Sequence, residues 1–284
     1  MVRQMFNEKF MRFPQGKCKA MTFSYDDGVR ADLRLLEIFA RCGLKGTFNL
    51  NSELFECADW HGRLNEEQTL SAFVGCGQEI ALHGARHLFL TKIPLPEAVK
   101  EIADNRAWLE EKFGAIVRGM AYAYNDFNGD IKKVLEHLGV AYARTTLPSH
   151  TFELPADWLE LKPTCHHGDP ELLGLADRFF TRTPAEEFKH REPWLFYIWG
   201  HSYEFDDNDN WEIIENLGRR AKSVGDVWHA TNIEIFNYVQ AFKRLEFSLD
   251  GERVHNPSAI PVWLDIRGKT YEVKSGATVV FERG

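Results

Sequence analysis

Short apolar runs rich in β-forming residues alternate with amphipathic stretches along most of this sequence. In one of the helical stretches, Leu33, Leu36 and Phe39 share a face, and Gly43 follows as a candidate C-terminal cap. Strands that alternate with helices predict a parallel α/β fold, and about seven or eight of them favour a TIM-like (β/α) barrel over an open sheet. The expected strands cover residues 18–25, 46–50, 79–83, 118–124, 140–145, 158–164, 194–199 and 226–229.

The last part of the chain has a different pattern. From about Leu245 onward, short β-rich runs follow one another with Gly and Asp turns between them. We therefore expect a (β/α) barrel domain over residues 1–244 and a short β-strand appendage over residues 245–284. The first expected strand is followed by neither a GxGxxG motif nor a P-loop, which disfavours nucleotide binding.

Composition and charge exclude several classes of function. A hydrophobic fraction of 44% argues against general disorder, and a net charge of −8 without a long basic run argues against nucleic-acid or anionic-membrane partners. No apolar stretch approaches the roughly 20 residues that cross a bilayer. The N-terminus lacks the apolar core of a signal peptide. We therefore expect a cytoplasmic protein, with export of a longer precursor as the alternative.

The cysteine pattern indicates a reduced protein. The cysteines are odd in number, widely spaced and without a CxxC pair, so they predict neither a disulfide framework nor a thiolate zinc site. They are Cys18, Cys42, Cys57, Cys76 and Cys165.

Polar residues gather at the carboxyl ends of the expected strands, which is where (β/α) barrels carry their functional side chains. Any single one could be a turn residue or a capped core side chain, but so many at one rim indicate a site. The group comprises Asp26, Asp27, Asn49, Asn51, His83, Tyr124, Asn125, Arg144, His166, His167, His201 and His229.

Within this rim, His83 and His87 are four residues apart in the segment HGARH. A helical turn after the strand would place both imidazoles on one face. Two histidines and one carboxylate form the three-ligand set of a catalytic zinc or a similar divalent ion. The alternative for the histidines is a surface pair, and the alternative for Asp26 is a side chain that hydrogen-bonds its own turn.

The segments SYDDG and HGARH together resemble the polysaccharide deacetylase family, the NodB-like group or carbohydrate esterase family 4. The family motifs are T-F-D-D-G and H-[ST]-x-x-H, and Gly84 replaces the hydroxyl residue of the second motif. The resemblance covers approximately residues 18–240 and implies a distorted (β/α) barrel. It also implies that Asp27, His83 and His87 hold one divalent metal ion, for which we expect Zn²⁺, with Co²⁺ or Ni²⁺ as alternatives.

The same resemblance implies that Asp26 is the general base that takes a proton from metal-bound water, whose pKa a divalent ion lowers to roughly 7. The segment LFYIWGHSYEF resembles the family's fifth motif, and its His201 is then the general acid that protonates the leaving amine. Glu204 and Asp206 follow it, and the sequence leaves open whether either supports the ring. The fourth motif has no clear counterpart.

The third family motif, R-x-P-[YF], is only partly matched. Aligned on GMAYAYND, its aromatic position is Tyr124, whose backbone N–H would help to bind the oxyanion. Its arginine position falls on Ala121. Arg118 lies earlier in the same strand and is expected to point elsewhere. We therefore infer that Arg144, at the end of the next strand, pairs with Asp26.

Further residues at this rim are candidates for substrate contact, with core packing as the alternative for the aromatic ones. They are Tyr25, Asn125, His166, His167 and Trp199.

The sequence thus predicts a metal-dependent hydrolase that removes N-acetyl groups from an N-acetylated sugar or polysaccharide, with that carbohydrate as its partner. Two alternatives stay open. One is an amidohydrolase that acts on a small non-sugar amide, and the other is a non-catalytic carbohydrate-binding relative. The appendage could serve in contacts of a homo-oligomer or in shaping the cleft.

Overall fold

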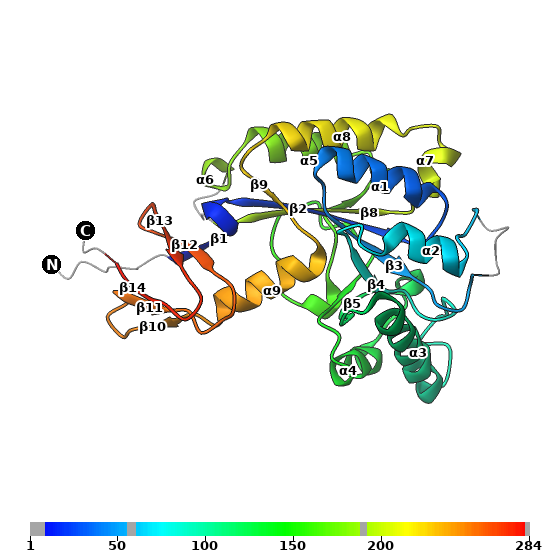
Figure 1. Ribbon diagram of the computed structural model, residues 1–284. Helices are drawn as coiled ribbons and strands as arrows, with labels where there is room; N and C mark the ends of the chain where they lie inside the picture. Colours follow the sequence, from blue (N-terminus) through cyan, green and yellow to red (C-terminus); the bar gives the residue numbers. More distant parts are fainter. Residues whose placement is uncertain (1–8, 56–60, 188–191, 282–284) are drawn as a thin grey trace.

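The computed structural model describes residues 9–55, 61–187 and 192–281, so Cys57 lies outside the described part. Its centre is a parallel sheet with the strand order β6-β5-β4-β3-β2-β8-β7, which curls into an incomplete barrel (Figure 1), and β9 also pairs with β2. The expected distorted (β/α) barrel is therefore confirmed. The strands are β2 (Lys19–Asp26), β3 (Gly46–Leu50), β4 (Glu79–Leu82), β5 (Gly119–Ala121), β6 (Tyr142–Arg144), β7 (Cys165–His166), β8 (Trp194–Gly200) and β9 (Val227–His229).

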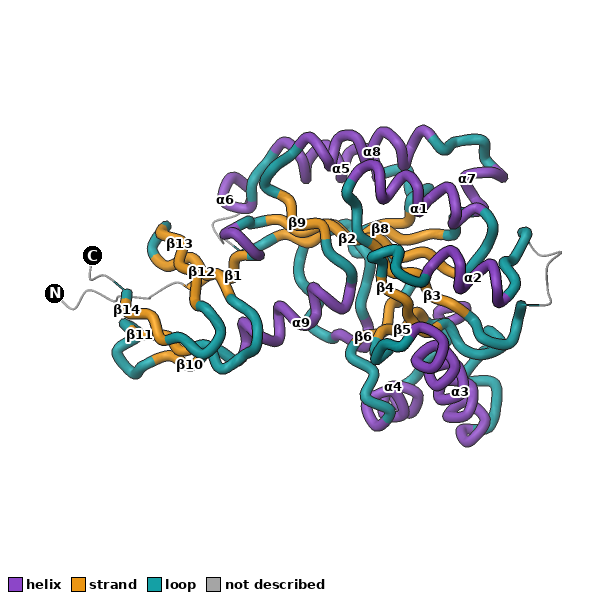
Figure 2. The backbone as a smooth tube through the Cα atoms, viewed as in Figure 1, coloured by secondary structure: helices purple, strands orange, loops and turns teal. Residues whose placement is uncertain are grey.

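Helices lie outside this sheet (Figure 2). The predicted C-terminal cap is confirmed at Gly43, whose φ of 69° ends the first helix, and Thr231 forms a capping box with Glu234 at the start of the last one. The helices are α1 (Ala31–Cys42), α2 (Glu66–Phe73), α3 (Leu95–Phe113), α4 (Gly129–His137), α5 (Leu172–Thr181), α6 (Pro184–Glu187), α7 (Tyr203–Asp207), α8 (Glu212–Ser223) and α9 (Asn232–Lys243).

The strand expected at 158–164 is wrong. Residues Trp158–Glu160 form a 3-10 helix, because the side chain of Asp157 accepts a hydrogen bond from the backbone N–H of Leu159. Pro163 then lacks the N–H that a strand would need. Regular pairing starts only at β7, so this part of the barrel is irregular.

Strand β2 is the central element, and all eight of its residues are buried. It pairs in parallel with β3 and with β8. Because successive side chains of a strand point to opposite faces, Phe23 and Tyr25 pack in the core cluster that also contains Leu35 and Phe39 of α1. Asp26 consequently points to the opposite face.

The N-terminus of α9 covers the end of the barrel at which the parallel strands begin. The side chain of Asn232 accepts a hydrogen bond from Oγ1 of Thr22 at 3.0 Å and donates to the hydroxyl of Tyr197 at 2.7 Å. The backbone N–H of Ile233 donates to Oε2 of Glu79 at 2.9 Å, so a carboxylate faces the positive end of the helix dipole.

The C-terminal residues form short strands, as the sequence predicts, and these strands make two small sheets. The N-terminal strand β1 (Lys9–Arg12) joins one of the sheets by pairing with β12 (Val262–Ile266). The sheets have the orders β1-β12-β13 and β10-β11-β14. This appendage packs beside α9 at the end where β2 begins (Figure 1), so it does not shape a cleft at the carboxyl ends of the strands. The remaining strands are β10 (Glu246–Phe247), β11 (Arg253–His255), β13 (Lys269–Val273) and β14 (Thr278–Val280).

Across the described ranges, no helix is both long enough and apolar enough to span a membrane.

The substitution Asn232→Ala is expected to lower the free energy of unfolding by about 2–4 kcal/mol. The hydroxyls of Thr22 and Tyr197 lose their buried partner, and an unsatisfied buried group costs about 1–3 kcal/mol. Urea denaturation followed by circular dichroism measures this loss. Lys133→Ala, which removes an exposed ion pair with Asp130, is the control and is expected to change stability by less than about 0.5 kcal/mol. Equal stability of the two variants contradicts the role of Asn232.

Candidate active site

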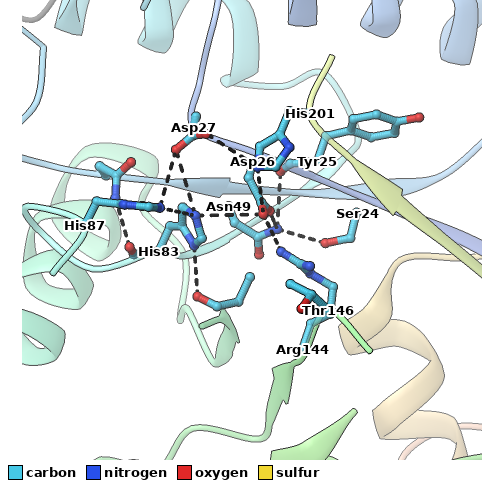
Figure 3. Close-up of polar contacts among 12 residues, drawn as sticks. Ser24, Tyr25, Asp26, Asp27, Asn49, His83, His87, Arg144, Thr146 and His201 are labelled. Carbon is cyan, nitrogen blue, oxygen red and sulfur yellow. Dashed lines mark hydrogen bonds and ion pairs between the residues drawn. The ribbon is translucent and has the colours of Figure 1, made fainter. Parts of the chain in front are cut away.

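The residues that the sequence singled out meet at the carboxyl ends of the barrel strands (Figure 3). They come from β2, the loop after β4, the end of β6 and the segment after β8. Their side chains point toward one another, and hydrogen bonds and ion pairs connect them. They are Asp26, Asp27, His83, His87, Arg144 and His201.

Asp27, His83 and His87 place three donor atoms around one point. The Nε2 atoms of the two histidines are 3.0 Å apart, and they lie 3.8 and 3.9 Å from Oδ1 of Asp27. The donor atoms of a tetrahedral zinc ion, with bonds of about 2.0–2.1 Å, are roughly 3.3 Å apart. Small side-chain shifts therefore fit this group, which we call the metal triad, to a divalent cation.

The hydrogen bond of His83 selects the nitrogen that faces this point. Its Nδ1 lies 2.9 Å from the carbonyl oxygen of Ala121, which only accepts, so Nδ1 carries the proton and Nε2 presents a lone pair. Burial and the neighbouring His83 lower the pKa of His87 to about 4, so its imidazole is neutral at physiological pH. Neutral, oriented imidazoles are the form that binds zinc.

The two histidines meet through a tight loop, and the helical turn that their spacing predicted is wrong. The backbone is left-handed at Gly84 (φ 80°) and at His87 (φ 58°), which a right-handed helix does not allow. A Cβ at Gly84 would lie 2.9 Å from Oε1 of Glu101. That oxygen accepts a 2.6 Å hydrogen bond from the backbone N–H of Arg86. Close packing of the loop therefore requires glycine at this motif position.

Arg63 and Asn51 connect the segments that carry the metal triad. The Nη1 of Arg63 donates to the backbone oxygen of Asp27 at 2.8 Å and to Oδ1 of Asn51 at 2.9 Å. Asn51 in turn donates to the backbone oxygens of His83 and Gly84, both at 2.9 Å. Asp27 has a φ of 84°, a conformation that costs a non-glycine residue about 1–3 kcal/mol, so it needs such support. Nothing in the local sequence marks Arg63 for this position.

Arg144 forms an ion pair with Oδ2 of Asp26, and both side chains are almost fully buried. The Nδ2 of Asn49 donates to the other carboxylate oxygen at 2.8 Å. Arg118 points elsewhere, because its guanidinium carbon lies 5.6 Å from the ring centre of Phe236. Of the two candidate arginines, Arg144 is therefore the one beside Asp26.

These contacts keep Asp26 ionised. Burial by itself would raise the pKa of Asp26, but the Arg144 guanidinium, His83 and His201 lower it to about 2. Its Oδ2 lies 3.8 Å from Nε2 of His83 and 3.9 Å from Nε2 of His201. The two adjacent aspartates thus differ: Asp26 forms a buried ion pair with Arg144, whereas Asp27 faces the Nε2 atoms of both imidazoles of the metal triad.

His201 lies beside the metal triad, and its Nε2 faces the aspartates at 3.9 Å from Asp26 and 3.8 Å from Asp27. Its Nδ1 lies 3.2 Å from Oε1 of Glu204. Burial alone would lower the pKa of His201, but the hydrogen bond with Glu204 and the charges of both aspartates raise it. Glu204 is the acidic residue that contacts this ring, whereas Asp206 accepts a hydrogen bond from a tryptophan indole.

A second group of candidate metal ligands consists of His166, His201 and Glu204, but its hydrogen bonds do not fit that role. The backbone N–H of Gly168 donates to Nδ1 of His166 at 3.0 Å, so this ring carries its proton on Nε2. That Nε2 lies 3.0 Å from Oε2 of Glu204 and has no lone pair left for a metal ion. The Nε2 of His167 lies 2.9 Å from the same oxygen. The cluster is therefore a carboxylate surrounded by imidazoles.

Burial would raise the pKa of Glu204, but its hydrogen bonds with these histidines lower it well below its usual range. Glu204 is thus an anion that keeps His166, His167 and His201 in place. Packing here depends on Gly200, since a Cβ at that position would lie 2.2 Å from Nδ1 of His167.

The side chain of Tyr25 is buried in the core and cannot meet a substrate, so its expected role in substrate binding is wrong. Its side chain is 1% exposed and packs against Phe48 and His167, at ring-centre distances of 6.4 and 5.7 Å. The alternation along β2 explains this position, because Tyr25 and Asp26 must point to opposite faces.

The other expected contact residues have different surroundings. Tyr124 is 56% exposed, and its ring centre lies 4.4 Å from that of His87. The side chain of Asn125 accepts a hydrogen bond from the backbone N–H of Thr146 at 2.9 Å, which is a structural contact. The ring of Trp199 lies 4.3 Å from the guanidinium carbon of Arg144.

Comparison with known sequences gives a family match over part of the chain. A family model described as polysaccharide deacetylase matches residues 14–143, which include Asp26 and the metal triad. This segment of the chain is therefore similar to the polysaccharide deacetylase family. Among curated proteins, no significant match was found.

Solved structures share the fold of this chain. A candidate polysaccharide deacetylase from Mycobacterium smegmatis is 19% identical, with a TM-score of 0.58 over 84% of this chain and 95% of that one. A carbohydrate esterase family 4 pseudoenzyme from Bacillus anthracis is 15% identical, with a TM-score of 0.51 over 80% of this chain and 68% of that one. These likenesses show the fold alone, so activity has to be argued from the site residues.

Arg63→Ala is expected to weaken Zn²⁺ binding by about 10- to 100-fold, because residues that orient metal ligands contribute affinity on this scale. Competition with a chromophoric chelator measures the Kd. Arg34→Ala, which removes a surface ion pair with Glu215, is the control and is expected to leave the Kd unchanged. Tighter binding in Arg63→Ala would show that the positive charge of Arg63 matters more than its hydrogen bonds, against this account.

Proposed function

We propose that this protein is a divalent-metal-dependent deacetylase that hydrolyses the N-acetyl group of an N-acetylated carbohydrate. The observation that carries the proposal is the different environment of the two adjacent aspartates. Asp27 shares one point with the Nε2 atoms of His83 and His87, whereas Asp26 is an ionised carboxylate paired with Arg144 and lies 3.9 Å from His201, whose pKa is raised. The site thus offers a metal ligand, a base and an acid that are close enough together to act on a single acetyl group.

A divalent cation held by the metal triad would act as a Lewis acid that polarises the acetyl carbonyl and lowers the pKa of water to about 7. The ionised Asp26 accepts the proton of the attacking water, and Arg144 with Asn49 keeps the carboxylate oriented. The backbone N–H of Tyr124 is the proposed donor to the carbonyl oxygen as negative charge develops there.

His201 completes the reaction by donating the proton on its Nε2 to the amide nitrogen while the carbon–nitrogen bond breaks. Acetate and the free amine of the sugar are the products, so one water molecule is consumed per acetyl group. The Glu204 carboxylate supports this step, because it holds the Nδ1 side of His201 and favours the protonated ring.

The presence of these ionisable residues supports a catalytic protein over a non-catalytic relative with the same fold. Asp26, Asp27 and three histidines are buried or half-buried in one place, and burying so many ionisable groups lowers stability unless function requires them.

Removal of metal ions with a chelator is expected to abolish deacetylation of N-acetylchitooligosaccharides, and added Zn²⁺ is expected to restore it. Asp26→Asn and His201→Ala are expected to lower kcat by about 10²- to 10⁴-fold, because each removes one proton transfer. Their zinc affinity stays within a few-fold of wild type. His150→Ala, at a histidine that pairs with Asp169, is the control and keeps full activity. Turnover by metal-free protein would refute the proposal.

The pH profile of kcat/KM is expected to follow His201, which must be protonated to act. Its raised pKa keeps the acid form present above pH 6.5, and activity falls as the pH rises through that pKa. Glu204→Gln removes the charge that favours protonation, so this alkaline limb is expected to move to lower pH by about one unit. An alkaline limb at the same pH in both proteins would assign it to another group.

A further inference from the structure

We propose that Phe89 and Tyr124 form a subsite for a neutral sugar ring next to the ring that is deacetylated. The proposal rests on the proposed function and adds to it a preference for oligosaccharides over single sugars. The two aromatic rings are stacked face to face, with centres 3.9 Å apart and planes 6° apart. They are 45% and 56% exposed, so the pair presents apolar area that the fold itself does not cover.

The pair directly borders the metal triad. Phe89 lies in the loop after β4, two residues after His87, and Tyr124 lies in the short 3-10 helix after β5 (Ala123–Asn125). The rings of His87 and Tyr124 pack edge to face, with their planes at 74° and their centres 4.4 Å apart. A ring bound on this pair is therefore the immediate neighbour of a group held at the metal triad.

Hydrogen bonds hold this aromatic pair in place before any ligand binds. The backbone N–H and the Oγ1 of Thr91 donate to the two carboxylate oxygens of Asp126, at 2.7 and 2.6 Å, and so connect the two loops. Tyr124 has a φ of 55°, a strained conformation for an aromatic residue. A rigid platform loses little conformational entropy on binding, which favours a role in recognition.

The chemistry of the platform selects its occupant. One face of a pyranose ring is made of C–H groups that pack against an aromatic ring, while its hydroxyl groups stay in water. Both carboxylate oxygens of Asp126, next to the aromatic pair, already accept hydrogen bonds from Thr91. The negative charge of Asp126 is therefore already compensated by hydrogen-bond donors. A neutral carbohydrate ring fits this surface better than a charged or a purely aliphatic ligand.

Steady-state kinetics of Phe89→Ala with N-acetylchitooligosaccharides of one to five units tests the proposal. The KM for the longer oligomers is expected to rise about tenfold, whereas kcat and the values for the single sugar stay unchanged. Phe89→Tyr keeps the aromatic face and is expected to restore the wild-type KM. Ile116→Ala, at a 78% exposed residue before β5, is the matched control for loss of an exposed apolar side chain.

Equal changes for the single sugar and the oligomers, or no change for any length, would overturn the subsite. Saturation-transfer NMR of N-acetylchitotriose with metal-free protein separates this result from the fate of the proposed function. If no N-acetylated sugar is hydrolysed, deacetylation fails, and loss of the NMR signal in Phe89→Ala but not in Ile116→Ala still supports the subsite. An NMR signal that Phe89→Ala leaves unchanged rejects it.

Discussion

The pleat of the central strand β2 is the constraint on which the site depends. All eight residues of this strand are buried, so every side chain must suit either the helix-facing core or the barrel interior. Phe23 and Tyr25 take the core side, and Asp26 therefore enters the barrel where Arg144 from β6 can reach it. Asp27 leaves the strand with left-handed backbone and turns toward His83 and His87. One alternation along one strand thus separates two neighbouring carboxylates into two environments.

Hydrogen bonds at the far side of each imidazole then distinguish the two histidine groups. A carbonyl oxygen beyond His83 forces the proton onto Nδ1 and leaves Nε2 free for a metal ion. A backbone N–H beyond His166 has the opposite effect and turns Nε2 into a donor to Glu204. Two clusters of similar composition therefore differ in chemistry: one can hold a cation, and the other supports His201.

Most of the fold and the grouping of Asp27, His83 and His87 could be predicted because their signals are local. Strand and helix periodicity, the DDG turn and the HGARH spacing are all readable within a few residues. The burial of Tyr25 was also readable, since Met21, Phe23 and Tyr25 alternate along an apolar run. The contact of Arg63 with Asp27 was not predictable from the sequence, because Arg63 lies in a loop with no periodic pattern and reaches Asp27 only in the folded chain. Neither was the pairing of β1 with β12, which depends on a contact between the two ends of the chain.

The account's central claim is that Asp27, His83 and His87 form the metal centre while the cluster around Glu204 binds none. Anomalous diffraction at the zinc edge from crystals of the zinc-loaded protein tests it most directly. We expect one strong peak about 2.0–2.1 Å from one oxygen of Asp27 and from Nε2 of each histidine. A peak between His166, His201 and Glu204, or a zinc ion that lacks any member of the triad, would contradict the account.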